Sequence, residues 1–551
     1  MLELYGQGVS TGIAIGTIRH YVNVSENVKK YKVEDVRTEL ERYRQGMKMA
    51  KIQLQKLYDE ACSQVSKSES VIFQTHIMIL EDSKFVENTE EIIKVRKLNA
   101  EYAVSYTAKM LAEIFKGLDD EYLKSRYTDI LDAGNTLIKI LQNKEQKKDA
   151  ESKQPMIIAA KELMPSETVS LKKNTLIGFV TNIGSPNSHT AILARTMGLP
   201  AVTQIDKDLS EFDGCTAIVD GQLGKVYINP DKNTMALYHA KKERYNKQRD
   251  NLKRQIGLPS VSKNGQKIIL SANIGMLEDI ENVEANDADG VGLFRSEYLF
   301  LNRNSVPSEE EQFEAYKRVI TEFKKSGVVI RTADLSADKG IDYIDMPNEK
   351  NPSMGFRGIR VCLANSDMFK TQLRALYRAS VYGKLKILLT MINNTEEVNY
   401  VKRIIKSVKR ELRAEGKQYN DNVQLGIMIE TPAAAIISDE LCSMVDFVSI
   451  GTNDLTQFTL AIDRANQKLE YSYEPYHKAI LRLIKLVVKN AHQCGIPVSV
   501  CGELASDTKL TPFFLALKTD ELSMAPSKIL QVRAKVRETN TEMIPKLLKE
   551  L

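Results

Sequence analysis

The apolar residues in the first part of the chain repeat with the period of an α-helix. From Val36 to Ala61, apolar or small residues follow one another at alternating spacings of four and three, which predicts one face of a long helix packed against other helices. All 15 prolines lie from Pro155 onward. Since proline interrupts the interior of a helix, the proline-free residues 1–154 favour a helical unit at about residues 30–143.

Strand-like runs lie on both sides of this helical unit. The run GVSTGIAIGTIRHYV (residues 8–22) has the glycine-bounded pattern of strands, and MIIAA, TLIGFV, TAIVD and KVYINP follow beyond a polar connector. The economical arrangement is one α/β domain made of residues 1–22 and 155–230, with the helical segment 23–154 inserted into it. A long polar helix within residues 231–260 then links this domain to the remainder of the chain.

The remainder of the chain alternates between strand-like and helix-like patterns. Its strand-like runs are IILSANIG, GVGLF, VVIRTAD, LKILLTMI, LGIMIE, FVSIGTND, PVSVCGE and DELSM. Eight strands separated by helices are typical of a (β/α)8 barrel, and an open doubly wound sheet is the alternative. Because the count of eight favours closure, we predict a multidomain α/β protein whose residues 261–551 form a TIM barrel.

Charge and cysteine content narrow the class of protein. Lys and Arg number 77 and Asp and Glu 72, a net charge of +5, without the strong basic excess of a nucleic-acid-coating protein. The six cysteines form no CxxC pair, which disfavours a disulfide framework or zinc site and favours a reducing compartment. The N-terminal residues lack a signal-peptide pattern, and no apolar run approaches the roughly 18 residues of a membrane helix. We therefore expect a cytoplasmic protein without membrane insertion and without a nucleic-acid partner.

Polar side chains follow several of the predicted barrel strands, at the strand ends that carry function in such barrels. Glu430 and Asp454 supply two hard oxygen ligands, which suit Mg²⁺ completed by water and substrate oxygens. Cys501 is placed to donate a proton to a carbanion or enolate. Guanidinium groups matched to carboxylate and phosphate belong to Arg295, Arg331, Arg357 and Arg464. Each residue alone has a structural explanation, but together they describe a pocket for a small, highly anionic phosphorylated acid.

A second constellation lies in NIGSPNSHTAILARTMGLPAV, residues 182–202. A glycine–proline turn precedes a short helix that Asn187 or Ser188 can cap and that Gly198 ends. His189 then stands at the helix N-terminus, where backbone N–H groups favour an anion. A histidine in this position suits a covalent carrier of a phosphoryl group, and a capping or turn histidine is the alternative.

Longer stretches match one known family in sequence and in order. They are SHTAILAR (188–195), ANIG (272–275), GVGLFRSEYLF (290–300), NPSMGFRGIR (351–360), TQLRALYRAS (371–380), GIMIETPAAA (426–435), SIGTNDLTQFTLAIDR (449–464), YHKAILRLI (476–484) and CGELA (501–505). Together they resemble enzyme I of the phosphoenolpyruvate-dependent sugar phosphotransferase system, the phosphoenolpyruvate–protein phosphotransferases. The resemblance implies transfer of a phosphoryl group from phosphoenolpyruvate to the chain, with release of pyruvate, and then to the histidine phosphocarrier protein HPr. This is the first step of sugar uptake by that system.

The resemblance also implies a role for each site residue. His189 would accept the phosphoryl group on Nε2, and Cys501 would protonate the enolate of pyruvate. Glu430 and Asp454 would hold the Mg²⁺ ion. Arg295 and Arg331 would bind the phosphate, and the further substrate contacts would come from Asn453, Asp454 and Arg464.

Partners and a large motion follow from the same resemblance. The helical unit would be the docking surface for HPr, with His76 as a candidate contact and not a second phosphorylated residue. The family works as a homodimer through its barrels. Because His189 lies on a different domain from the barrel pocket, the phosphohistidine domain is expected to swivel as a rigid body.

The chain departs from the family's commonest pattern at four positions. Ser185, Ser336 and Ala337 stand where glycines are customary, and Thr390 replaces a customary proline. Such changes can alter loop flexibility near the substrate and lower the rate. They remove none of the proposed ligands, so activity is still expected.

Other classes of protein share part of this pattern. Pyruvate phosphate dikinase and phosphoenolpyruvate synthase share the histidine domain and the barrel but need a large ATP-binding unit, and residues 1–154 contain no P-loop. A nitrogen-pathway version of enzyme I would carry a further N-terminal sensory domain, for which no room is expected. A non-catalytic regulator that binds HPr is disfavoured because four residues are intact: His189, Glu430, Asp454 and Cys501. The substitutions at Ser336, Ala337 and Thr390 keep this alternative open. A metal-dependent aldolase or lyase barrel accounts for residues 261–551 alone.

Overall fold

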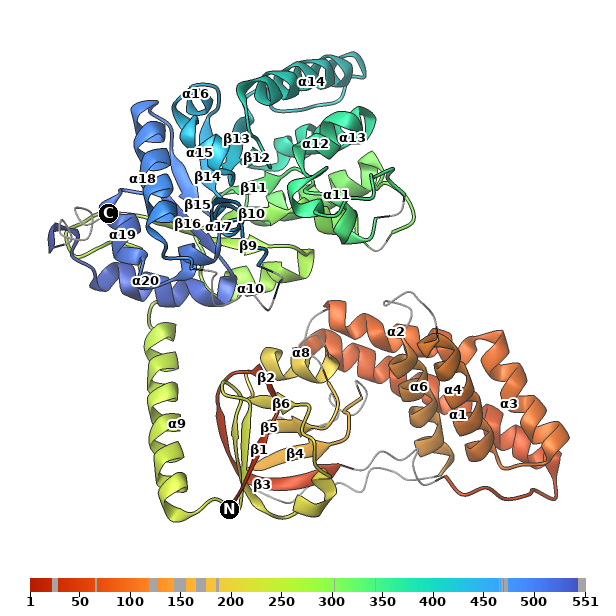
Figure 1. The fold of residues 1–551 in the computed structure, drawn as a ribbon. Coiled ribbons are helices and arrows are strands. Elements are labelled where there is room, and N and C mark those ends of the chain that lie inside the picture. Colours follow the sequence, from red (N-terminus) through yellow and green to blue (C-terminus); the bar gives the residue numbers. More distant parts are fainter. Residues whose placement is uncertain are drawn as a thin grey trace. The chain divides into compact units, whose positions relative to one another are not determined.

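The protein folds into two compact units, Met1–Arg249 and Asp250–Leu551, which are described separately. The structure is a computed structural model (Figure 1). It describes residues 1–21, 28–64, 67–117, 126–142, 155–164, 175–184, 188–301, 303–341, 343–464, 466, 469 and 474–543.

The first unit contains an eight-stranded sheet with the order β1-β8-β7-β3-β4-β5-β6-β2. Its strands are β1 (Leu2–Tyr5), β2 (Gln7–Ser10), β3 (Ile13–Tyr21), β4 (Met156–Ala160), β5 (Leu176–Thr181), β6 (Ala201–Thr203), β7 (Thr216–Asp220) and β8 (Lys225–Ile228). In β4, Ile157 and Ala159 join one buried apolar cluster, whereas Ile158 and Ala160 join another. This period of two is typical of a strand with both faces covered.

Helices occupy the part of the chain between β3 and β4, which pair in parallel as neighbours in the sheet. They are α1 (Val36–Gln64), α2 (Lys67–Glu81), α3 (Ser83–Arg96), α4 (Ala100–Lys116) and α6 (Tyr127–Leu141). Helix α1 begins at Val36 and buries Tyr43, Ala50 and Leu54 along one face, as the spacing predicts. The prediction of an inserted helical bundle is therefore confirmed.

His76 contradicts one expectation for this bundle. Its side chain has no exposed surface and lies on α2 beside two carboxylates of α6, with Nε2 4.0 Å from Asp129 and Nδ1 3.8 Å from Asp132. A side chain without exposed surface cannot contact a docked protein. The suggestion that His76 is a docking contact is wrong, because residues at helical spacing on an amphipathic helix also include those that face the core.

The long polar helix predicted after the sheet is α9 (Lys232–Lys253), in which Tyr238 is the buried residue. The boundary between the two units falls inside α9, between Arg249 and Asp250. Among the described residues of either unit, no helix is long and apolar enough to cross a membrane.

The second unit is a closed barrel of eight parallel strands, ordered β10-β11-β12-β13-β14-β15-β16-β9. The strands are β9 (Ile269–Ile274), β10 (Val291–Arg295), β11 (Val328–Arg331), β12 (Leu385–Leu389), β13 (Gln424–Ile429), β14 (Phe447–Ile450), β15 (Val498–Val500) and β16 (Glu521–Met524). Each matches one of the eight predicted runs, although β10 extends one residue beyond its run at Arg295 and β13 begins one residue before its run at Gln424. The closed barrel is confirmed and the open sheet is excluded.

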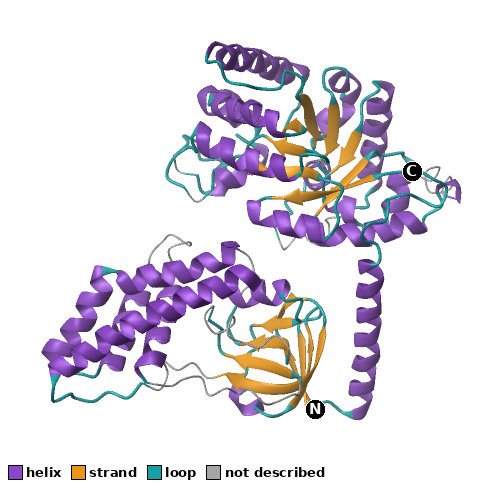
Figure 2. Cartoon of the chain, turned by 180° about the vertical axis from the view of Figure 1, so that it is seen from behind, coloured by secondary structure: helices purple, strands orange, loops and turns teal. Residues whose placement is uncertain are grey.

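Helices surround these strands, as Figure 2 shows in purple around the orange barrel. They are α10 (Ile280–Ala285), α11 (Glu309–Glu322), α12 (Ile359–Ala364), α13 (Ser366–Ala379), α14 (Thr395–Ala414), α15 (Pro432–Ile436), α16 (Ser438–Cys442), α17 (Thr452–Leu460), α18 (Lys478–Gln493), α19 (Thr511–Ala516) and α20 (Ile529–Glu538). Helix α14 illustrates why they form. Asn394 and Glu397 make a capping box at its start, and its buried face includes Val398, Val401 and Ile405.

Candidate active site

One pocket of about 640 Å³ lies at the carboxyl ends of the barrel strands. Its lining includes every barrel residue that the sequence singled out: Arg295, Arg331, Arg357, Glu430, Asn453, Asp454, Arg464 and Cys501. Parallel strands bring their carboxyl ends to one face of a barrel, so residues far apart in sequence meet there.

Strand register explains why two of these positions, Glu430 and Cys501, lie at one level. Ile429 of β13 pairs with Ile450 of β14, and Ile450 pairs with Val500 of β15. Glu430 and Cys501 are the residues that follow these paired strand ends. Each therefore emerges from its strand at the same edge of the barrel.

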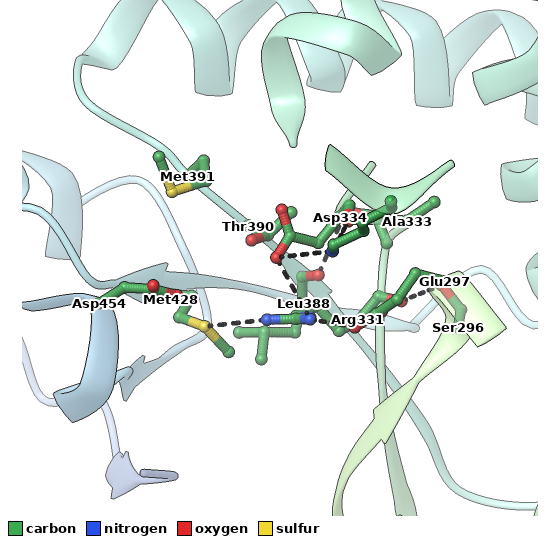
Figure 3. A network of polar contacts seen from close by, with 12 residues as sticks. Ser296, Glu297, Arg331, Ala333, Asp334, Leu388, Thr390, Met391, Met428 and Asp454 are labelled. Carbon is green, nitrogen blue, oxygen red and sulfur yellow. Dashed lines mark hydrogen bonds and ion pairs between the residues drawn. The ribbon is translucent and has the colours of Figure 1, made fainter. Parts of the chain in front are cut away.

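Arg331, the last residue of β11, is buried and held by groups from several elements. Its guanidinium donates to Glu297 and lies 3.4 Å from Asp334, and Nη1 lies 3.9 Å from the sulfur of Met428. Figure 3 shows the guanidinium between Met428 and these carboxylates. These contacts fix the orientation of the cation before any substrate arrives.

Asp334 joins two of the arginines. Arg357 donates to both oxygens of Asp334 at 2.9 Å, and Nη2 of the same arginine donates to Asp454 at 3.1 Å. Burial alone would raise the pKa of Asp334, but Arg331 and Arg357 outweigh it and hold the pKa of this carboxyl far below its ordinary value. Asp334 therefore remains an anion at every physiological pH.

Glu430 is buried and lines the pocket. Its Oε1 accepts hydrogen bonds from the hydroxyl of Thr390 at 2.8 Å and from the backbone N–H of Met391 at 2.6 Å. Burial, followed by the neighbouring carboxylates of Asp454 and Asp334, raises the pKa of Glu430 to about 7. A cation beside this group would remove that penalty.

The carboxylates of Glu430 and Asp454 fit a divalent cation. Asp454 Oδ1 is buried, makes no hydrogen bond among the described residues and lies 3.7 Å from a guanidinium nitrogen of Arg464. No group of three or more His, Cys, Asp or Glu side chains suited to a metal occurs in the part of the chain that the structure describes. Two carboxylates without further protein ligands suit an ion whose shell water and substrate complete.

Cys501 is buried and has the protonation state that an acid needs. Burial raises the pKa of its thiol to about 11, so the sulfur carries its proton at neutral pH. The thiol donates to the backbone carbonyl of Ile450 at 3.6 Å. A neutral thiol in the pocket wall can deliver a proton to a carbanion placed next to it.

Two of the remaining predicted contacts, Asn453 and Arg464, lie on the segment after β14, and the third, Arg295, ends β10. Asn453 accepts a hydrogen bond from the backbone N–H of Glu503 at 2.9 Å, which ties the end of β14 to the loop after β15. Arg464 is 44% exposed and reaches Asp454 from the pocket rim. Arg295, the last residue of β10, is half-buried.

The substituted glycines near the pocket cause no backbone strain where they are described. Ser336 has φ −158° and ψ 160°, an extended conformation open to any residue, and its hydroxyl donates to Asp338 at 2.6 Å. Ala337 opens a short 3-10 helix and is not among the residues with positive φ. Ser185 lies outside the described residues.

His189 is the first residue of α8 (His189–Thr196), in the first unit. Of the two candidate caps, Ser188 accepts a hydrogen bond from the backbone N–H of Ala191 at 3.4 Å, while Asn187 lies outside the described residues. Gly198 follows the helix with φ +64°. The predicted short helix and its stop are therefore confirmed, and the catalytic role of His189 stays a prediction.

Sequence reasoning missed the two carboxylates that hold the arginines. Glu297 stands two residues after Arg295, and Asp334 three residues after Arg331. Both acids follow a strand-end arginine on the same loop, and that local spacing is the signal that would have found them. The omission matters because these two carboxylates orient the arginine side chains that line the pocket.

Comparison with known proteins identifies the family. Three family models match the chain: the PEP-utilising enzyme N-terminal model at residues 5–126, the PEP-utilising enzyme mobile domain at 152–224, and the PEP-utilising enzyme PEP-binding domain at 249–541. The last covers more than half of the chain and contains the whole pocket.

Similar proteins match from end to end. A protein of Listeria monocytogenes named phosphoenolpyruvate-protein phosphotransferase is 39% identical over 554 residues, covering 100% of this chain and 96% of the relative. A protein of the same name from Bacillus subtilis is 38% identical, covering 98% of this chain and 95% of the relative. A solution structure titled Enzyme I (nEIt) is 33% identical over 44% of this chain and 99% of that chain, with a TM-score of 0.37. The chain therefore belongs to the PEP-utilising enzymes, in the family of the phosphoenolpyruvate-protein phosphotransferases.

Proposed function

We propose that the chain transfers the phosphoryl group of phosphoenolpyruvate to its own His189 and then to HPr, the first step of sugar uptake by the phosphotransferase system. The observation that carries this proposal is the barrel pocket lined by Arg295, Arg331, Glu430, Asp454 and Cys501. These groups match the chemistry of phosphoenolpyruvate. The arginines suit its phosphate and carboxylate, the two acidic side chains can bind a metal ion, and the neutral thiol can donate a proton.

The arginines bind and orient the substrate. Phosphoryl transfer depends mainly on charge neutralisation and in-line placement. The guanidinium groups of Arg331 and Arg357 are already fixed by Glu297 and Asp334, so they lose little freedom when an anion binds. Arg295, Arg464 and Asn453 complete the contacts to the phosphate and carboxylate.

Glu430 and Asp454 hold the divalent metal ion, which we propose to be Mg²⁺. Each offers an anionic carboxylate oxygen, and Asp454 Oδ1 makes no hydrogen bond to any described residue. When bound, the ion neutralises charge on the oxygens of the phosphate and of the enolate. The raised pKa of Glu430 is consistent with a site built to contain a cation.

The reaction needs one covalent step and one proton transfer. Nε2 of His189 attacks phosphorus, the P–O bond of phosphoenolpyruvate breaks, and the bonding electron pair stays on the enolate oxygen. The thiol of Cys501 then gives its proton to the methylene carbon, which yields pyruvate, and the thiolate regains a proton from water. Burial keeps that thiol protonated beforehand by raising its pKa to about 11.

The domain roles complete the proposal. Residues 1–22 and 155–230 form the phosphohistidine domain, residues 23–154 the HPr-docking unit, residues 231–260 the linker and residues 261–551 the substrate-binding barrel. The phosphohistidine domain swivels between the barrel and HPr, two copies pair through their barrels, and the protein acts in the cytoplasm.

The test is incubation with phosphoenolpyruvate radiolabelled in its phosphoryl group, in the presence of Mg²⁺. Wild type should acquire acid-labile, base-stable label, and purified HPr should then remove it. His189→Ala should acquire none, whereas His239→Ala, which changes an exposed histidine of α9, should be labelled like wild type. Absence of label on folded wild type would overturn the proposal and favour a non-catalytic regulator.

A further inference from the structure

The turn after β12 is built around one oxygen of Glu430. Thr390 directly follows the strand, its side chain has no exposed surface, and its hydroxyl donates to Glu430 Oε1 at 2.8 Å. The next residue, Met391, donates its backbone N–H to the same oxygen at 2.6 Å. Two donors from one turn thus occupy both lone pairs of Oε1.

The backbone of this turn is held in an uncommon conformation. Met391 is buried and has φ +57°, in the left-handed region that costs a residue other than glycine about 1 kcal/mol or more. In this conformation the backbone N–H of Met391 points at Glu430 Oε1. Strain of this kind persists where surrounding contacts fix it, and it gathers at functional sites.

The other oxygen of Glu430 lies on the side of Asp454. A Cβ atom added to Gly451 would stand 2.9 Å from Glu430 Cβ and 3.1 Å from Glu430 Oε2. Gly451 directly precedes α17, the helix that carries Asp454 in its first turn. Oε2 therefore lies against the segment that supplies the second carboxylate.

We propose that Thr390 is a positioning residue for the metal site: its hydroxyl fixes the rotation of the Glu430 carboxylate so that Oε2 meets the divalent ion together with Asp454. This inference rests on the proposed function. The last side-chain torsion of glutamate, χ3, takes a broad range of values. A carboxylate held only by the hydrogen bond from the Met391 N–H could therefore rotate about χ3. Outer contacts of this kind typically change metal affinity by about 10–100-fold.

Valine has nearly the shape of threonine without the hydroxyl, so Thr390→Val tests the contact directly. The full-length protein is titrated with Mn²⁺ in the absence of phosphoenolpyruvate, and the free ion is followed by electron paramagnetic resonance. Thr390→Val should bind Mn²⁺ about 10–100-fold more weakly than wild type. Thr390→Ser, which keeps the hydroxyl, should bind close to wild type, and excess Mn²⁺ should restore phosphorylation of Thr390→Val.

Thr332 offers a matched control. It follows β11 as Thr390 follows β12, it is equally buried, and its hydroxyl bonds the backbone carbonyl of Leu388 at 3.5 Å instead of a metal ligand. Thr332→Val should leave Mn²⁺ affinity unchanged. Thr390→Ala also lacks the hydroxyl and serves if the valine variant fails to fold.

The outcomes separate this inference from the proposed function. Wild type and Thr390→Val with equal Mn²⁺ affinity would overturn the role of Thr390 and leave the metal site intact. Wild type without Mn²⁺ binding would overturn both. Equal losses in Thr332→Val and Thr390→Val would also overturn the inference, because they would indicate general loosening of the barrel.

Discussion

At the scale of single residues, the ionisation of Glu430 decides whether the pocket attracts a cation. Burial and the carboxylates of Asp454 and Asp334 raise its pKa from 4.5 to about 7. The protonated form is thus favoured in the folded chain. In the metal-free protein, protonated Glu430 contributes its full stabilisation of the fold at pH values below 4.5, its pKa in the unfolded chain. That contribution is lost as the pH rises through about 7, its pKa in the folded chain.

The affinity for a metal ion should change with pH in the opposite direction and increase as the pH rises. A divalent ion competes with the proton on Glu430, so affinity for Mn²⁺ should fall as pH drops below about 7, by up to about tenfold per pH unit. Titration calorimetry measures the affinity for Mn²⁺ at each pH, and the His189→Ala variant is used because it cannot turn over. Glu430→Gln should bind weakly at every pH. An affinity for Mn²⁺ that stays constant across neutral pH would contradict the raised pKa.

The identity of the pocket residues is readable from the sequence, but their pairing is not. Arg331, Glu430 and Cys501 each stand at or just after the end of an apolar strand, and that position alone marks them. Glu297 follows β10 and Arg331 ends β11, and the two side chains meet because these strands pair as neighbours in the barrel. Contacts across loops depend on side-chain packing, on which the hydrophobic pattern carries no information.

At the scale of elements, the junction between the ends of β14 and β15 depends on Gly502. A Cβ atom there would lie 1.9 Å from the hydroxyl of Thr452 and 2.9 Å from the amide oxygen of Asn453. Gly502→Ala should therefore displace the start of α17 and weaken phosphoenolpyruvate binding, and it should cost about 1–3 kcal/mol of stability.

Binding and melting measurements check this prediction. Gly117→Ala is the control, because its Cβ would make ordinary contacts at 3.5 Å and its φ is −82°. That variant should bind the substrate like wild type. A Gly502→Ala protein with unchanged substrate affinity would show that the loop after β15 yields without disturbing Asn453.

Prediction of short strands succeeds where they alternate regularly with amphipathic helices and fails where this alternation is missing. The eight barrel runs are recognisable because each apolar strand is separated from the next by an amphipathic helix, as at α14. Strands β1 and β6, of four and three residues, were not predicted. So few residues show no periodicity, and pairing with β8 and β2 defines these strands in the sheet.

At the scale of the whole molecule, the proposed phosphoryl acceptor and the proposed substrate pocket belong to different units. His189 lies within Met1–Arg249 and the pocket within Asp250–Leu551. Each unit has its own apolar core. Two compact units with separate cores should unfold in separate transitions, and a ligand stabilises only the unit that binds it.

Calorimetry of the full-length His189→Ala protein should show this separation. With phosphoenolpyruvate and Mg²⁺ at about a hundredfold excess over Kd, one transition should gain about 2.7 kcal/mol and rise by several degrees. The other should stay in place. Adding Glu430→Gln should abolish the shift without moving the second transition. If both transitions rose together, the substrate would stabilise both units, and the proposed swivelling motion would have to precede binding instead of following it.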